Sequence, residues 1–217
     1  MSWFFKVLGS DGVNSAKVYS NGALAVTDQT PNIGAYCISE QSGTIAAALA
    51  ANSSVFAMRI DPGAGTIKAI IDTIRVQVNT IAAFSTPVTA GRRLAIFRGS
   101  GASASAQTAI TIATPKDTVY PASEFDTAAG GDIRIAATGA LTVTGITFES
   151  APIVVMPLTQ VGSAGNFVEY LYEFTVRSHP VELNAGQLLA IRNPVAMDAG
   201  GTWILTVTVN WHEAVGD

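Results

Sequence analysis

Alternation of apolar and polar side chains is the feature that most constrains how this chain folds. In residues 168–177 and again in residues 203–211, every second residue is large and apolar. Trp203 and Trp211 bound the apolar face of the second segment, and His212 continues its opposite face. Because successive side chains of a strand point to opposite faces, a period of two predicts strands with one buried and one solvent-facing side.

Further strands are expected along most of the chain after residue 31. Short apolar runs that Gly, Pro, Asn or Asp residues bound, such as residues 55–60, predict buried strands. Residues 66–80 form a longer alternating segment. One of its faces is predicted to carry the aliphatic residues Ile70, Ile74, Val76 and Val78. The Ala-rich residues 44–51 allow either a short helix or a strand.

The order of these segments indicates an all-β fold. Thr, Val and Ile dominate, Gly and Pro punctuate, and strands do not alternate with helical patterns. Such chains form sandwiches, jelly rolls or barrels. Because 217 residues is long for an immunoglobulin-type sandwich, we expect a jelly-roll-like antiparallel β-sandwich with an N-terminal arm and hairpin.

Residues 1–30 differ from the rest and are predicted to form that arm and hairpin, ahead of a sandwich domain at residues 31–217. Three aromatic residues, Trp3, Phe4 and Phe5, stand near the start, and Asn21-Gly22 is a strong hairpin turn signal. The aromatic residues could dock on a neighbouring protein or fold back on the domain's own core. Trp3, Phe4 and Phe5 are the interaction residues that the sequence predicts.

Composition narrows the classes of partner. Hydrophobic residues make up 48% of the chain and charged residues only 13%. A surface with so few charges is common where a protein packs against copies of itself or a partner, although a monomer with a mildly polar surface fits as well. The net charge of −4 argues against a nucleic-acid partner, since the basic residues are scattered and their densest group is Arg92, Arg93 and Arg98.

No apolar run approaches the roughly 20 residues of a membrane span, and the first residues do not resemble a signal peptide. The expectation is a protein made in a cytoplasm, with no membrane partner, that reaches its final location by assembly.

The residues that could carry chemistry are sparse. Cys37, the single cysteine, lies in an apolar run and is expected to be a buried structural thiol. His179 and His212 lack the spacing of a zinc site or a catalytic triad. Glu169 and Glu173 share a strand face, where a glycosidase pair is possible but a solvated face is the better interpretation. We predict no catalytic residue, metal ligand or cofactor, and no enzymatic activity.

Three segments, residues 84–101, 139–153 and 186–211, are rich in Thr, Ala and Gly, and the last contains an Arg-Asn-Pro turn. Together with the segment KVYSNGALAVTDQT at residues 17–30, they resemble small β-rich virion structural proteins of tailed bacteriophages. The resemblance covers most of the chain and rests on strands rich in Thr, Ala and Gly and on the Arg-Asn-Pro turn, not on a catalytic motif. It implies a jelly-roll-like protein that decorates or cements a capsid, or forms part of a tail, and it implies no catalytic residues.

Three hypotheses of function follow. The first is a capsid decoration or cement protein that forms homo-oligomers and binds the major capsid protein or other virion proteins. The second is a tail, neck or fibre-base component, which needs the same kind of self-associating domain. The third, of another class, is a carbohydrate-binding jelly-roll module in which Tyr170, Tyr172 and Trp211 could present aromatic rings.

Overall fold

A computed structural model describes residues 32–46, 48–84, 91–110, 122–158, 165, 167–174, 180–197 and 200–215. These residues belong to one compact unit, Asn32–Asp217. The arm and hairpin expected at residues 1–30 lie outside the described residues.

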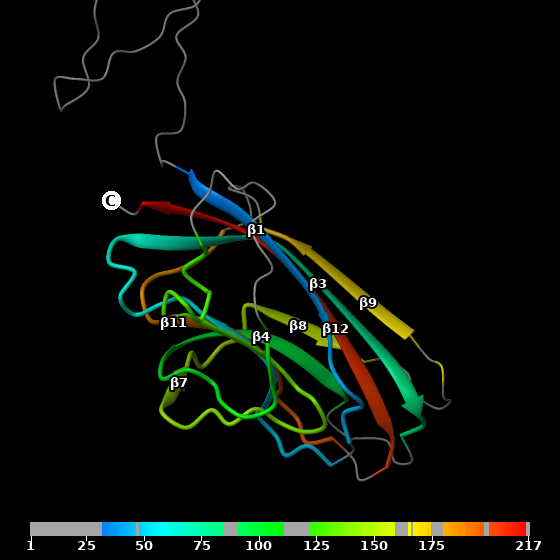
Figure 1. The fold of residues 1–217 in the computed structure, drawn as a ribbon. Coiled ribbons are helices and arrows are strands. Elements are labelled where there is room, and N and C mark those ends of the chain that lie inside the picture. Colours follow the sequence, from blue (N-terminus) through cyan, green and yellow to red (C-terminus); the bar gives the residue numbers. More distant parts are fainter. Residues whose placement is uncertain are drawn as a thin grey trace, which may run out of the picture. The chain divides into compact units, whose positions relative to one another are not determined.

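The described residues form two antiparallel sheets that face each other as two layers (Figure 1). The first sheet contains β1 (Asn32–Gln41), β3 (Ile67–Ala82), β9 (Phe167–Glu173), β10 (Val181–Leu183) and β12 (Thr202–Val215). The second sheet contains β2 (Ser53–Arg59), β4 (Arg93–Gly101), β5 (Thr108–Ala109), β6 (Asp132–Ile135), β7 (Ile146–Phe148), β8 (Val154–Pro157) and β11 (Gln187–Asn193).

The connectivity is that of a jelly roll. The first sheet has the order β1-β12-β3, with β9 and β10 sharing the far edge of β3, and the second runs β5-β6-β2-β11-β4, with β7 and β8 sharing the far edge of β4. The chain changes sheet at each step from β1 to β4, and again from β8 to β9, from β10 to β11 and from β11 to β12. The expected jelly-roll-like antiparallel sandwich is therefore confirmed.

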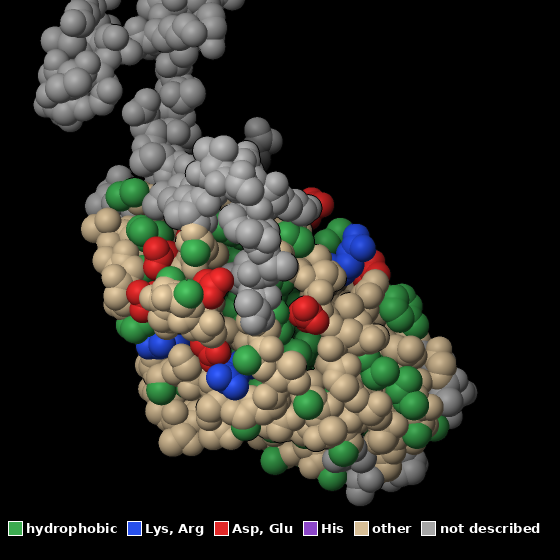
Figure 2. All heavy atoms as spheres, viewed as in Figure 1, with side chains coloured by type: hydrophobic (Ala, Val, Ile, Leu, Met, Phe, Trp, Pro, Cys, Tyr) green, Lys and Arg blue, Asp and Glu red, His purple; other side chains and the backbone are tan. Residues whose placement is uncertain are grey.

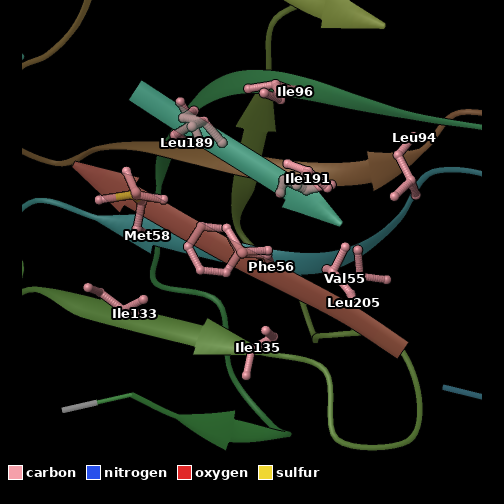
Figure 3. Packing of buried hydrophobic residues seen from close by; sticks show 14 of the residues in the cluster. Val55, Phe56, Met58, Leu94, Ile96, Ile133, Ile135, Leu189, Ile191 and Leu205 are labelled. Atoms are coloured by element: carbon pink, nitrogen blue, oxygen red, sulfur yellow. The ribbon is translucent and has the colours of Figure 1, made fainter. Parts of the chain in front are cut away.

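The core lies between the two sheets, and β12 runs through its centre. On β12 the inward residues are fully buried, and they are Trp203, Leu205, Val207, Val209 and Trp211. Facing side chains of the second sheet interdigitate with them (Figure 3). The alternation in residues 203–211 is confirmed, because β12 pairs with β1 on one side and β3 on the other and so keeps one face toward the core.

The predicted face of β3 is wrong in its first half. Ile70 lies on the outer side, whereas Ile71 and Ile74 are both fully buried. The cause is a β-bulge: Asn210 pairs with Thr73 and Trp211 with Ile71, so one extra β3 residue, Asp72, interrupts the ladder. An extra residue reverses the facing of every side chain beyond it.

Residues 44–51 form neither a helix nor a strand within their described part. Ile45 makes an isolated antiparallel bridge to Trp203, with its amide 2.8 Å from the Trp203 carbonyl, and its side chain is fully buried. Ala48 then takes a φ of 63°, a left-handed value that ends any regular element. The apolar residues of this segment cover one end of the core.

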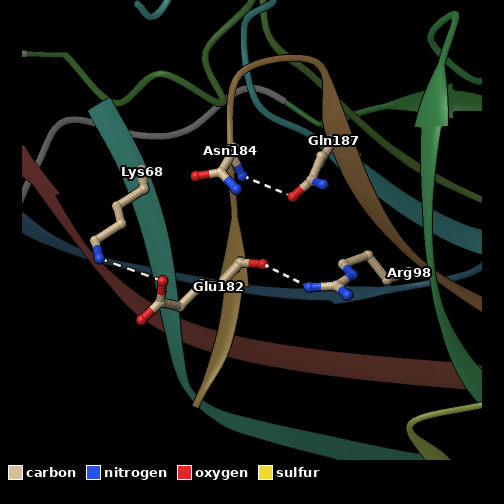
Figure 4. A network of polar contacts seen from close by, with 5 residues as sticks. All are labelled: Lys68, Arg98, Glu182, Asn184 and Gln187. Carbon is tan, nitrogen blue, oxygen red and sulfur yellow. Dashed lines mark hydrogen bonds and ion pairs between the residues drawn. The ribbon is translucent and has the colours of Figure 1, made fainter. Parts of the chain in front are cut away.

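A polar network joins the two sheets beside β10 (Figure 4). Lys68 of β3 forms an ion pair with the Glu182 carboxylate of β10 at 3.2 Å. Arg98 of β4 in the second sheet donates to the Glu182 carbonyl at 3.5 Å and to Glu149 at 2.6 Å. Arg98 therefore links β10 with the segment that follows β7.

Loops cover part of the outer face of the second sheet. Ala57, Leu188 and Ala190 point outward from β2 and β11, yet they are buried beneath Ala104 and Leu141. The cover does not extend along the whole face, and the uncovered part carries the site described next.

Candidate binding site on the outer face of the second sheet

The residues that the sequence singled out do not come together in one site. Trp3, Phe4, Phe5 and His179 lie outside the described residues. Cys37 is half-buried and lies on the outer face of β1 opposite Asn210, so the expectation of a buried thiol in the core is wrong. Cys37 pairs with Asn210, which lies on the polar outer face of β12, so the Cys37 side chain lies on the outer face of the sheet as well.

His212 lies on the outer face of β12, as predicted. Its Nδ1 is 3.0 Å from both carboxylate oxygens of Asp72, the bulge residue of β3. Glu169 is held by Gln77 and lies 3.8 Å from Arg75. These contacts are those of a solvated sheet surface, in agreement with the interpretation preferred from the sequence.

The aromatic residues considered for carbohydrate binding have structural positions instead. Trp211 is 1% exposed, stacks on Tyr36 at 5.6 Å and meets Phe125 edge-on at 5.3 Å. Tyr170 and Tyr172 stack on each other at 6.3 Å and pack against the core, and the Tyr170 hydroxyl donates to the Pro157 carbonyl. This bond ties β9 to β8 and closes one side of the sandwich. The three rings therefore do not form the exposed platform that the third hypothesis would need.

Within the described ranges, no three His, Cys, Asp or Glu side chains lie together as metal ligands would. The described residues also contain no helix that could cross a membrane.

A hollow of about 620 Å³ opens on the uncovered part of the second sheet. Its walls include Asn52, Arg93, Phe148, Pro152, Val155 and Arg192, which come from four separate parts of the chain. We call it the basic hollow, because two arginines line it on a chain whose net charge is negative.

Arg192 is the most constrained side chain of the basic hollow. Its guanidinium lies over the Phe148 ring, 3.9 Å from the centroid, and 5.3 Å from that of Phe97. Its Nη2 and Nε donate to the Asn52 carbonyl at 2.7 and 3.2 Å. Burial lowers the pKa of Arg192, but an arginine stays protonated in proteins. The stacking and the two hydrogen bonds fix the direction in which the remaining N–H groups point.

Arg93 supplies the second positive charge. It is half-buried at the start of β4, and its guanidinium makes no hydrogen bond or ion pair within the described part of the chain. Glu149 also lines the basic hollow, but Arg98 binds its carboxylate at 2.6 Å. The two arginines therefore face the hollow without a carboxylate of their own.

This site was not predicted from the sequence. Arg92, Arg93 and Arg98 form a group in the sequence, but the structure separates them: Arg92 lies over Phe84, Arg98 binds Glu149, and of the three only Arg93 lines the hollow. A jelly roll brings β4, β8 and β11 side by side although they are distant in sequence. The available signal was that Arg192, directly after the apolar residues 188–191 of β11, has the parity of an outward-facing residue.

A second surface lies on the outer face of the first sheet. Ile81, Phe167 and Leu171 are 44%, 61% and 49% exposed, and we call them the apolar stripe. Phe167 pairs with Asn79, so Ile81 is its diagonal neighbour. Within the described residues β9 pairs only with β3, and the stripe therefore borders an open strand edge. Apolar side chains gather along this side of the molecule (Figure 2).

Comparison of the chain with protein families, with characterised proteins and with solved structures finds no match.

Proposed function

We propose that the chain is a non-enzymatic structural protein of a tailed-bacteriophage virion, which decorates or cements the capsid as a homo-oligomer. The observation that carries the proposal is the apolar stripe beside an open strand edge. Ile81 and Phe167 are exposed diagonal neighbours, and Leu171 follows on the same face beyond Glu169. A group of exposed apolar residues, unlike a single one, is typical of an association surface. The occupant that we assign to the stripe is a second copy of the chain.

The fold supports this proposal. Jelly rolls recur in viral capsid domains, and also in lectins. Because one fold hosts many functions, the argument rests mainly on the surface. With only 13% charged residues, this chain has few charges to desolvate when copies pack together. Homo-oligomers of soluble proteins are mostly closed and symmetric, which suits a repeated shell component.

The proposed partners are the major capsid protein or other virion proteins, and no nucleic acid, membrane or cofactor is part of the proposal. Trp3, Phe4 and Phe5 are assigned to contacts with a neighbouring subunit or the shell. Deleting residues 1–16 should then abolish attachment and leave the circular dichroism spectrum unchanged. A truncated chain that still binds shells would contradict this role of the aromatic residues.

Light scattering after size-exclusion chromatography tests self-association. We expect the wild-type chain to elute as an oligomer and the double variant Phe167→Ser, Leu171→Ser as a monomer. Val215→Ser serves as the matched control, since Val215 is 38% exposed at the end of β12, away from the stripe. A monomeric wild-type chain, or a double variant that associates like the control, would overturn the assignment of the stripe.

Quantitative mass spectrometry of purified virions tests the location. A copy number comparable to that of the major shell protein is expected for decoration or cement. A small copy number would move the protein to the tail, the neck or a fibre base, which is the alternative within the same class. Absence from the particles would overturn the virion role and favour a carbohydrate-binding module.

A further inference from the structure

The basic hollow lies on the opposite outer face from the apolar stripe, so assembly through the stripe leaves it open. Phe167 and Leu171 point away from the core on the first sheet, and Arg192 points away from it on the second. Packing on Phe148 and hydrogen bonds to Asn52 hold Arg192, but neither arginine has a carboxylate partner in the hollow. The two positive charges are therefore available to a ligand.

We propose that the basic hollow binds a saccharide that carries a carboxylate, such as a uronic or sialic acid unit of a surface glycan. Arg93 and Arg192 would bind the carboxylate. The apolar walls would pack on the C–H faces of the sugar rings, and Asn52 and Ser150 would hydrogen-bond its hydroxyl groups.

The two guanidinium groups determine the charge of the ligand. A guanidinium matches a carboxylate with parallel N–H donors, which makes this pair one of the stronger hydrogen-bonded pairs in proteins. Arg192 is held by the Asn52 carbonyl and by the Phe148 ring, so little side-chain entropy is lost when it binds. Because Glu149 is already paired with Arg98, no acidic side chain of the hollow competes for Arg192.

The shape and the walls favour a saccharide over a peptide. A volume of about 620 Å³ falls in the range of small-molecule sites and fits a ligand of a few rings. Extended peptides commonly bind by adding a strand to a sheet edge. Here the neighbouring edge strand, β8, ends in Pro157 and follows Pro152 by two residues, and proline supplies no N–H for such pairing.

Isothermal titration of the full-length chain with digalacturonic acid, 3′-sialyllactose and neutral lactose tests the proposal. We expect at least one of the two acidic sugars to bind, and lactose to bind at least about tenfold more weakly, since hydrogen bonds to charged groups are stronger than neutral ones. Arg93→Gln and Arg192→Gln should each weaken binding of the acidic sugar about tenfold or more.

Arg75→Gln is the matched control, because Arg75 lies exposed on the outer face of the first sheet and its loss changes the net charge equally. Arg93→Gln keeps the test decisive if Arg192→Gln unfolds the Asn52 loop. The proposal is overturned by lactose binding as tightly as the acidic sugars, or by an Arg75→Gln effect equal to that of Arg93→Gln. No binding of any sugar, or equally tight binding of a tetraglutamate peptide, would overturn it too.

Discussion

The Ser123 hydroxyl donates to the Glu213 carboxylate over 2.5 Å, inside the core and 90 residues along the chain. Glu213 is 1% exposed, and its carboxylate also accepts from the Glu124 amide at 3.0 Å and from Trp211 Nε1 at 3.2 Å. It thereby anchors the loop before β6 to the end of β12.

Stability should fall as the pH rises through the titration of Glu213. Burial raises the pKa of this carboxyl above its ordinary value of 4.5, although the three hydrogen bonds oppose the shift. Between the two pKa values the folded state holds a proton that the unfolded state has released. The stability that Glu213 contributes is therefore fully present below about pH 4.5 and is lost as the pH rises through the folded pKa. Urea unfolding at a series of pH values should show a smaller decline in Glu213→Gln than in the wild type.

A second variant, Ser123→Ala, tests the same titration of Glu213. Ser123→Ala removes a donor that lowers the pKa of Glu213, so its decline in stability should extend to higher pH than that of the wild type. If the wild-type and Glu213→Gln curves run parallel from pH 4 upward, burial does not govern this carboxyl.

The alternation of apolar residues was sufficient to predict much of the fold. It predicted β12 and β9 with their correct faces, because both strands have one side against a single continuous core. It failed at Ile70, since a bulge adds one residue without changing the composition around it. The basic hollow was not predictable, because it depends on which distant strands become neighbours, as Arg192 and Phe148 do.

Because of the bulge at Asp72, two isoleucines of β3 should contribute differently to the free energy of unfolding. Ile74→Ala leaves a cavity in the core and should lower the free energy of unfolding by about 2–5 kcal/mol. Ile70→Ala, on the outer side of the same strand, should lower it by less than roughly half as much. Chemical denaturation of both variants measures the difference. Equal losses would mean that the alternation predicted from the sequence is correct and the bulge is not.

Replacing each of two buried serines by alanine should have different effects on stability. Ser42 Oγ accepts from the Leu205 amide at 2.8 Å and donates to the Gly43 carbonyl at 2.7 Å, so Ser42→Ala should cost about 1–3 kcal/mol. Ser54 is fully buried, and its hydroxyl has no partner among the described residues. Ser54→Ala should therefore be neutral or slightly stabilising. Thermal unfolding compares them, and a loss at Ser54 as large as at Ser42 would contradict the unpaired hydroxyl.

Two glycines between β5 and β7 should also differ in how much their replacement by alanine changes stability. A Cβ on Gly131 would overlap the Glu124 carbonyl and the Phe125 backbone, neither of which can move without disturbing the loop that Glu213 anchors. Gly131→Ala should therefore lower the free energy of unfolding by about 3 kcal/mol or more. Most point variants lower it by about 0.5–3 kcal/mol. A Cβ on Gly139 meets no described atom within 4 Å, so Gly139→Ala should be neutral or stabilise by up to about 1 kcal/mol. Denaturation midpoints of the two variants measure this, and a tolerated Gly131→Ala would show that the Glu124–Phe125 loop can shift away from β6.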